Sequence, residues 1–428
     1  MKTRWQTAVI LLALAFSFSC HTVHPGQTHQ QAKQEVTAKN ILGNPDYLAI
    51  SFGGYRGNSR DIQPTVEQLK EDLKILDAMN FKVLRTYNTK LAEAANLLKA
   101  IHELKQETPK FEMYVMLGAW IDCKNAWTNH PNHEDEDADA NAAEIQRAVD
   151  MANQYPDIVK IIAVGNEAMV KWAASYFVQP RVILKYVNQL QALKKSGKLP
   201  KDLWVTCSDN FASWGGGDAE YHVEDLTQLI KAVDYVSMHT YPMHDTHYNP
   251  AFWGNFKGEE TRSDTAKIAA AMTRARDYAV SQYQSVAKYL KKLGIEKPIH
   301  IGETGWASAS NEHYGANGSK ATDEYKEGLY YKMIREWTNR NGVACFYFEV
   351  FDEIWKDAAN PGGSENHFGL FTIDGQAKYA IWDLVDKGVF KGLSRGGNPI
   401  IKTYGGDEKA LRKEVLLPPM NQKMPVTH

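Results

Sequence analysis

The feature that most constrains the fold is a series of eight short apolar runs spread along the chain. Most are rich in Val, Ile, Tyr and Phe and lack a clean alternation of apolar and polar residues, which is typical of strands buried on both faces. We expect a strand in each of the ranges 47–52, 81–87, 111–117, 159–164, 203–207, 233–238, 298–301 and 343–348.

Amphipathic helical patterns fill the intervals between these runs. The first begins at Pro64 and carries Val66, Leu69, Leu73 and Leu76 on one face. Similar stripes lie in 91–101, 143–151, 182–193, 266–293 and 325–337. Successive runs start about 30 residues or more apart, which leaves room for a right-handed crossover through a helix.

Eight strand–helix units predict an α/β fold, a (β/α)8 TIM barrel that forms a single domain over residues 45–395. The alternative is an open doubly wound sheet. A Gly-rich phosphate-binding loop, which nucleotide-binding sheets of that kind carry after a strand, follows none of the eight runs. We therefore prefer the barrel, followed by a Pro-containing C-terminal tail over residues 396–428.

The N-terminal residues have the features of an export signal. Lys2 and Arg4 precede the apolar stretch 8–18, which is too short to span a bilayer, so we expect a signal peptide over residues 1–19. Cys20 follows a small residue, as at a bacterial lipoprotein cleavage site, and we predict that it is acylated. Residues 20–44 are then a polar tether. The alternative is an ordinary signal peptide with an incidental cysteine.

These features predict a protein exported across the inner membrane and held by its lipid at the outer membrane or the cell surface, with the periplasm as an alternative. Membrane contact is expected only through that anchor. The net charge of −2 favours neither nucleic acid nor an anionic membrane as a partner. Cys123, Cys207 and Cys345 lack the spacing of a disulfide framework or a zinc site, so we expect buried free thiols.

Two glutamates end two of the apolar runs. Glu167 follows the fourth expected strand and Glu303 the seventh. Strand carboxyl ends meet at one mouth of a barrel, where active sites lie, so the two side chains can face each other. Two carboxyl groups about 5–5.5 Å apart can cleave a glycosidic bond with retention, one attacking the anomeric carbon while the other protonates the leaving oxygen. We therefore predict a glycosidase.

The other residues at the expected strand ends are amides, aromatic side chains and a few charged groups. Such a rim offers many hydrogen-bonding groups and flat apolar surfaces, which suit a neutral polyhydroxylated ligand. A phosphate-binding site would need more Arg and Lys. No cofactor is expected. Tyr55 and Tyr241 are predicted to bind substrate, Tyr241 as a hydrogen-bond partner of an acidic group, and Trp306 is predicted to be a sugar platform, with Trp120, Trp253 and Trp355 as weaker candidates.

Three segments resemble glycoside hydrolase family 17, a retaining family built on this barrel that contains β-1,3-glucan hydrolases and transglycosylases. They are 164–167 (Val-Gly-Asn-Glu), 302–306 (Gly-Glu-Thr-Gly-Trp) and 85–87 (Arg-Thr-Tyr). The resemblance covers roughly residues 45–385. It implies that Glu167 is the acid/base, that Glu303 is the nucleophile and that Asn166 hydrogen-bonds the sugar 2-hydroxyl.

The same resemblance extends to the last strand and the segment after it. It places Arg85 and Tyr87 on the second strand, where we predict that they bind substrate, and it places Glu353, Lys356 and Glu365 in the substrate cleft. Ala307 stands where plant members usually have Pro. The segments 122–144 and 244–280 exceed a minimal barrel, and we expect them to reshape the cleft ends.

The predicted function is retaining hydrolysis of a laminarin-like β-1,3-glucan by a secreted lipoprotein. A glucanosyltransferase with the same catalytic pair is one alternative, and a non-catalytic glycan-binding lipoprotein is another. A metal-dependent hydrolase is a third, because His and acidic residues cluster in 130–137 and 239–247. Solvated charge at a helix start explains the first cluster more simply, so no metal site is predicted.

Overall fold

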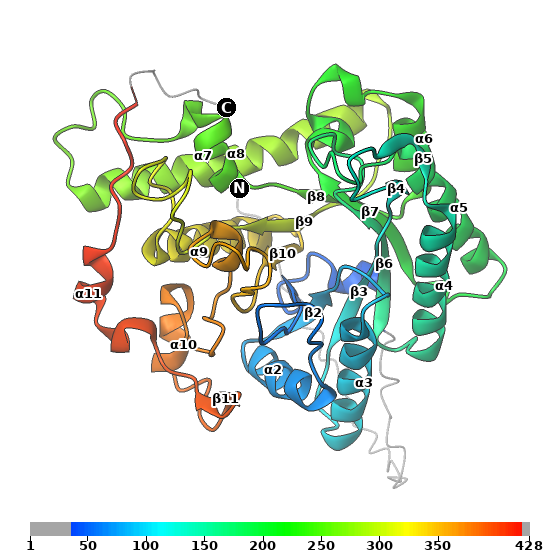
Figure 1. The fold of residues 1–428 in the computed structure, drawn as a ribbon, viewed down its shortest axis with the longest axis horizontal. Coiled ribbons are helices and arrows are strands. Elements are labelled where there is room, and N and C mark those ends of the chain that lie inside the picture. Colours follow the sequence, from blue (N-terminus) through cyan, green and yellow to red (C-terminus); the bar gives the residue numbers. More distant parts are fainter. Residues whose placement is uncertain (1–35, 422–428) are drawn as a thin grey trace, which may run out of the picture. The chain divides into compact units, whose positions relative to one another are not determined.

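A closed barrel of eight parallel strands forms the centre of the molecule in the computed structural model, which describes residues 36–421 (Figure 1). Around the barrel the strands follow the order β1, β2, β3, β6, β7, β8, β9, β10. This confirms the predicted TIM barrel. The strands are β1 (Leu48–Ser51), β2 (Phe81–Arg85), β3 (Tyr114–Ala119), β6 (Val159–Asn166), β7 (Trp204–Asn210), β8 (Val236–His239), β9 (Ile299–Gly305) and β10 (Cys345–Phe348).

Helices connect successive strands and pack on the outside of the barrel. Helix α4, for example, packs against β3 and β6, and α5 against β6 and β7 (Figure 1). The connecting helices are α2 (Val66–Ala78), α3 (Ala92–Glu107), α4 (Ala138–Gln154), α5 (Pro180–Lys195), α6 (Glu224–Ala232), α7 (Pro242–Tyr248), α8 (Asp264–Lys292) and α9 (Glu324–Arg340). Thr65 starts α2 with a capping box to Gln68, as the Pro-Thr pair suggests.

Alternating strand residues belong to two separate hydrophobic clusters. Ile50, Leu84 and Ile162 join the cluster between the barrel and its helices. Their neighbours on the same strands, such as Val83 and Ile161, join a second, smaller cluster inside the barrel. The strands are therefore buried on both faces, which is why their sequences show no polar side.

A short helix, α1 (Ala38–Ile41), contributes to this inner cluster. Ala38 and Ile41 are fully buried, and Leu42 packs with them. The prediction that the tether extends to residue 44 is therefore wrong from Val36 onward. The apolar residues of this segment form a helical turn and pack in the inner cluster. The signal peptide, Cys20 and the rest of the tether lie outside the described residues.

The predicted boundary at residue 396 is also wrong. Strands β11 (Ser394–Arg395) and β12 (Asn398–Pro399) form a hairpin across it. The chain continues through the short helix α11 (Glu408–Lys413) to a segment that packs on the barrel: Asn255 exchanges backbone hydrogen bonds with Pro419 and Asn421. The described part of the tail thus belongs to the same compact unit as the barrel, while residues 422–428 lie outside the description.

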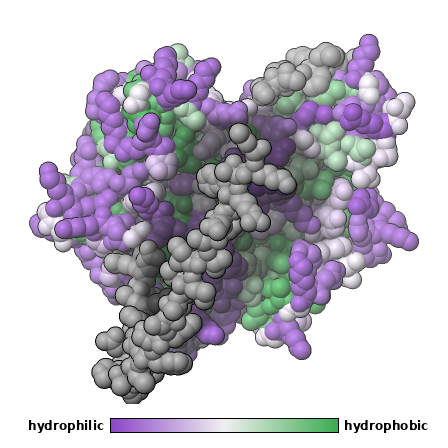
Figure 2. Space-filling model, turned by 180° about the vertical axis from the view of Figure 1, so that it is seen from behind, coloured by the Kyte–Doolittle hydropathy of each residue, from purple (hydrophilic) through white to green (hydrophobic). Residues whose placement is uncertain are grey.

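The face shown in Figure 2 is mostly hydrophilic, with hydrophobic residues reaching the surface in separate patches. Among residues 36–421, no helix is long and apolar enough to cross a membrane. Cys123, Cys207 and Cys345 are buried free thiols, as predicted.

Truncation of Ile41 tests whether α1 is part of the folding unit. Ile41→Ala should lower the free energy of unfolding by about 2–5 kcal/mol, because it leaves a cavity in the inner cluster. Denaturant unfolding followed by circular dichroism measures this. Ile62→Ala is the control, because Ile62 is 65% exposed and should change stability by less than about 0.5 kcal/mol. Equal stabilities of the two variants would contradict the role assigned to α1.

Candidate active site

A cleft of about 1060 Å³ opens at the carboxyl ends of the barrel strands. It is large for a single small ligand, and residues at or just after the carboxyl ends of all eight barrel strands line it. Nine of the predicted catalytic and substrate-binding residues line it: Tyr55, Tyr87, Asn166, Glu167, Tyr241, Glu303, Glu353, Lys356 and Glu365.

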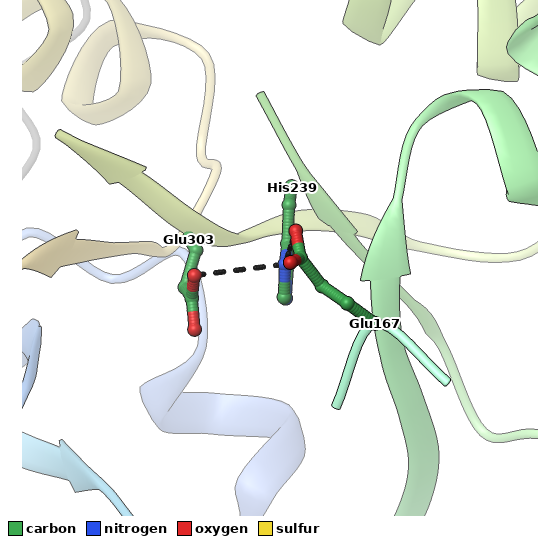
Figure 3. A group of neighbouring side chains, drawn as sticks. All are labelled: Glu167, His239 and Glu303. Atoms are coloured by element: carbon green, nitrogen blue, oxygen red, sulfur yellow. Dashed lines mark hydrogen bonds and ion pairs between the residues drawn. The ribbon is translucent and has the colours of Figure 1, made fainter. Parts of the chain in front are cut away.

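Glu167 and Glu303 face each other across this cleft (Figure 3). Glu167 follows β6 and Glu303 lies in β9. One carboxylate oxygen of Glu167 lies within 4.8 Å of one of Glu303. Inverting glycosidases need about 6.5–9.5 Å between their carboxyl groups to admit a water molecule, so this short separation favours the retaining arrangement.

The backbone at the end of β6 is bent so that the Glu167 side chain enters the cleft. The register with β7 shifts between Ala163 and Asn166, and φ is 82° at Gly165 and 48° at Glu167. The Glu167 amide donates a hydrogen bond to the carbonyl oxygen of Ser208, which holds this turn. A left-handed glutamate is an unfavourable conformation, and such strain is common at functional sites.

Both carboxylate oxygens of Glu303 have hydrogen-bond donors. Arg85 Nη1 donates to Oε1, and the Tyr241 hydroxyl donates to Oε2 over 2.8 Å. Arg85 Nη2 also donates to Asn166 Oδ1 over 2.6 Å, so a single guanidinium links the nucleophile candidate to the residue before Glu167. Tyr241 thus has the partner predicted for it.

The two carboxyl groups have opposite pKa shifts. Burial and the negative charge of Glu303 raise the pKa of Glu167 well above its usual range. Burial alone would also raise the pKa of Glu303, but the charge of His239 when its ring is protonated, the Arg85 guanidinium and the Tyr241 hydroxyl overcome this and hold it below its usual range. At neutral pH, Glu303 is therefore ionised while Glu167 tends to keep its proton.

His239, at the end of β8, is a site residue that the sequence reasoning did not assign. Its Nδ1 lies 3.0 Å from Glu167 Oε1 and 3.6 Å from Glu303 Oε2, and its Nε2 lies 2.8 Å from Ser208 Oγ (Figure 3). Burial lowers the pKa of His239 to about 4, so the imidazole is neutral at pH 7. Its position at a strand end, just before Thr240 and Tyr241, was the available signal.

Two predicted substrate contacts are wrong. Trp306 is fully buried beneath the cleft, where its indole Nε1 donates to the carbonyl oxygen of Ala321, so it offers no face to a sugar. Arg85 is 1% exposed and lies behind Glu303 and Asn166. It therefore orients Glu303 and Asn166 and stabilises the negative charge of Glu303 instead of contacting substrate. Trp253 is likewise buried, whereas Trp120 and Trp355 line the cleft.

Other aromatic side chains that the sequence analysis did not assign also reach the cleft. Trp172 comes from the loop after Glu167 and is 63% exposed, and Tyr221 and Tyr248 also line the cleft. Trp127, from the loop between β4 (Cys123–Lys124) and β5 (Asn132–Glu136), stacks on Tyr176 beside Trp120. The inserted hairpin thus packs against Trp120, which lines the cleft, and the reshaping of the cleft ends stays a prediction.

The suspected metal clusters are engaged otherwise. Glu134, Asp135 and Glu136 each pair with a Lys or Arg, and Asp137 caps α4. Within residues 36–421, only Glu167, His239 and Glu303 bring ligand atoms close enough to share an ion. There the Glu303 oxygens already accept from Arg85 and Tyr241, and the guanidinium would repel a cation.

Known proteins resemble the chain over most of its length. Residues 49–369 match the BtgE/BtgC glycoside hydrolase domain. The crystal structure of an endo-laminarinase from Formosa Hel1_33_131 is 69% identical, with a TM-score of 0.90, and the match covers 92% of this chain and 100% of that one. A family 17 β-1,3-glucanosyltransferase from Rhizomucor miehei shares the fold at 20% identity and a TM-score of 0.54, over 78% and 96% of the two chains.

A glucan 1,3-beta-glucosidase from Arthroderma benhamiae is 27% identical over 274 residues, which are 62% of this chain and 70% of the relative. The match to the btgC protein of Aspergillus niger covers 71% of this chain but only 37% of that longer protein. The family match spans well over half of the chain and agrees with the catalytic pair at the barrel mouth. The chain belongs to the BtgE/BtgC glycoside hydrolase family.

Proposed function

We propose that the protein is a retaining endo-β-1,3-glucanase that acts by double displacement. One observation carries this proposal: an oxygen of Glu167 lies within 4.8 Å of one of Glu303, and Arg85 and Tyr241 stabilise the ionised form of Glu303 while the pKa of Glu167 is raised. That is the charge state needed for a nucleophile and an acid. The roles implied by the family resemblance, Glu303 as nucleophile and Glu167 as acid, agree with these charges.

The geometry explains how Glu167 can serve in both steps. When Glu303 attacks the anomeric carbon, Glu167 protonates the leaving oxygen. In the covalent intermediate Glu303 is an uncharged ester, so the charge that raised the pKa of Glu167 is gone. The Glu167 pKa then falls, and its carboxylate can accept a proton from the water that releases the product.

The substrate assignment is supported by the cleft and by the named relatives. Amides, acids and aromatic rings around the pair suit a neutral sugar chain. The closely similar Formosa structure is of an endo-laminarinase, and the Arthroderma relative is named for β-1,3-glucan. The volume of the cleft, about 1060 Å³, and its lining from all eight strand ends support cleavage within a chain instead of at its end.

The alternatives are less well supported. A glucanosyltransferase would use the same pair, with a sugar acceptor in place of water, and the aromatic rings near Glu167 could hold such an acceptor. A purely glycan-binding protein would not need two buried carboxyl groups in opposite charge states. We further propose that the enzyme is exported and anchored through acylated Cys20, on the strength of the apolar stretch 8–18 and the Cys that follows it.

Product sizing on a panel of glucans tests the activity. The wild type should cut β-1,3-glucan into short oligosaccharides and leave β-1,4- and β-1,6-glucans intact. Glu303→Ala should abolish the activity, and Glu167→Ala should lower kcat on glucan by about 100-fold or more, because general acid catalysis is lost. Elongated chains would instead indicate a transferase, and an unimpaired Glu303→Ala variant would overturn the assignment.

Azide separates the two catalytic roles within the same experiment. With an activated aryl glycoside, azide should rescue Glu167→Ala and give a β-glycosyl azide, because a small anion needs no general base. Glu303→Ala should not give that product. The opposite pattern would exchange the roles of the two glutamates.

Tyr241→Phe tests the electrostatics. The tyrosine hydroxyl stabilises the charged form of Glu303, so its removal should raise the Glu303 pKa. Activity should then be lost at a higher pH on the acidic side of the kcat/KM profile. Tyr283→Phe, on α8 and outside the cleft, is the control and should leave the acidic limb in place. An unchanged profile for Tyr241→Phe would show that the hydroxyl does not set the charge of Glu303.

The anchor is tested in a bacterial host that processes lipoproteins. Wild-type protein should incorporate labelled palmitate and partition with membranes, whereas Cys20→Ala should do neither. Cys207→Ala, which alters a buried thiol, is the matched control and should still be labelled. Equal labelling of the Cys20→Ala variant would contradict acylation at this position.

A further inference from the structure

A second pair of carboxyl groups lies in the cleft, away from the catalytic pair. Glu93 and Glu353 both line the cleft, and they are 3% and 4% exposed. Glu353 is well partnered: Trp355 Nε1 donates to it over 3.0 Å, and Lys356 Nζ lies at 3.2 Å. Glu93 differs, because its Oε1 has no hydrogen-bond partner among residues 36–421.

A buried carboxyl oxygen without a partner is unfavourable, and native structures rarely leave one unless a ligand or a function accounts for it. The chain nevertheless holds Glu93 firmly in place. It lies in the first turn of α3, where its backbone amide donates to Gln63 Oε1 over 2.8 Å. The family resemblance assigns no role to Glu93, and the catalytic mechanism does not use it.

The surroundings of Glu93 suit a sugar ring. Tyr55 and Trp355 line the same part of the cleft, with ring centroids 5.6 Å apart, and the Arg60 guanidinium covers the Trp355 ring at 4.4 Å. Gly53 makes room for the second acid, because a Cβ there would lie 2.3 Å from Glu353 Oε1. Aromatic surface and buried acids thus converge in one place.

The position in the barrel tells which part of a glucan would lie here. Gly53 follows β1 and Trp355 follows β10, on the side of the barrel away from β6 and Glu167. A chain of contacts joins this part of the cleft to the nucleophile. Lys356 lies over the Phe348 ring, and Tyr241 contacts both Phe348 and Glu303. Glu167 protonates the leaving sugar, so the retained, glycone part of the chain extends toward Glu93.

We propose that Glu93 is a substrate-binding residue that hydrogen-bonds a hydroxyl of a glucosyl unit held by Tyr55 and Trp355 in the glycone part of the cleft. This inference rests on the proposed function. Burial and the neighbouring Glu353 raise the pKa of Glu93 well above its usual range. A neutral carboxylic acid can both donate and accept, which matches a sugar hydroxyl better than a carboxylate does. Glu93 thereby favours substrates long enough to reach it.

Two variants separate binding from folding. Glu93→Gln keeps the shape and a neutral group that donates and accepts, whereas Glu93→Leu keeps the approximate size without hydrogen bonding. Kinetics are measured on aryl β-glycosides with one to four β-1,3-linked glucosyl units, which extend only into the glycone side. Glu93→Leu should raise KM about 3- to 10-fold for the long substrates, with kcat little changed, and leave the shortest unaffected.

Glu93→Gln should stay within about 2-fold of the wild type, well below the factor expected for loss of a hydrogen bond. Calorimetry with β-1,3-gluco-oligosaccharides in a Glu303→Gln background should give the same ranking without turnover. Equal losses on short and long substrates, or equal effects of Leu and Gln, would make Glu93 structural and overturn the inference. Unchanged affinity of Glu93→Leu would also overturn it. Failure of the wild type to bind or cleave any β-1,3-glucan would instead refute the proposed function.

Discussion

Two neighbouring carboxyl groups, that of Glu303 buried and that of Glu167 largely so, impose the main constraint on this molecule. Both cannot be ionised cheaply at so short a distance, so one must be stabilised as a carboxylate and the other left protonated. Arg85 and Tyr241 stabilise Glu303, and neutral His239 gives Glu167 no cation. Much of the arrangement at the barrel mouth follows from this asymmetry.

The barrel makes this difference in charge between the two glutamates possible, because strands distant in sequence end side by side. Arg85 from β2 reaches across the barrel interior to β9, where its Nη1 also donates to the Gly302 carbonyl oxygen over 2.9 Å. Gly302 is needed there, since a Cβ would come within 2.2 Å of Ser237 Oγ. A closed and tightly packed interior therefore fixes the charged groups more rigidly than loops alone could.

The expected strands were confirmed because their signals are local, and the structure brings the two predicted catalytic acids together at the barrel mouth. An apolar run buried on both faces is a strand of the barrel wall, packed between the barrel interior and the surrounding helices. An acid that follows the carboxyl end of such a strand lies at the mouth of the barrel. Strands β6 and β9 nevertheless extend past the apolar runs, to Asn166 and Gly305, because neighbouring strands still pair where the interior becomes polar. The errors concern burial: Trp306 looks like a platform in sequence, and α1 looks like a tether, until their packing partners are known.

The sequence by itself determined the barrel and the family and predicted the two catalytic acids, since periodicity and strand-end position are properties of short segments. Only the tertiary structure decided that Arg85 acts behind the cleft, that His239 is neutral beside Glu167, and that Glu93 is buried without a partner. Protonation and exposure depend on groups brought together from far along the chain. Their free energies arise from desolvation and charge at distances of a few ångströms, which no single segment encodes.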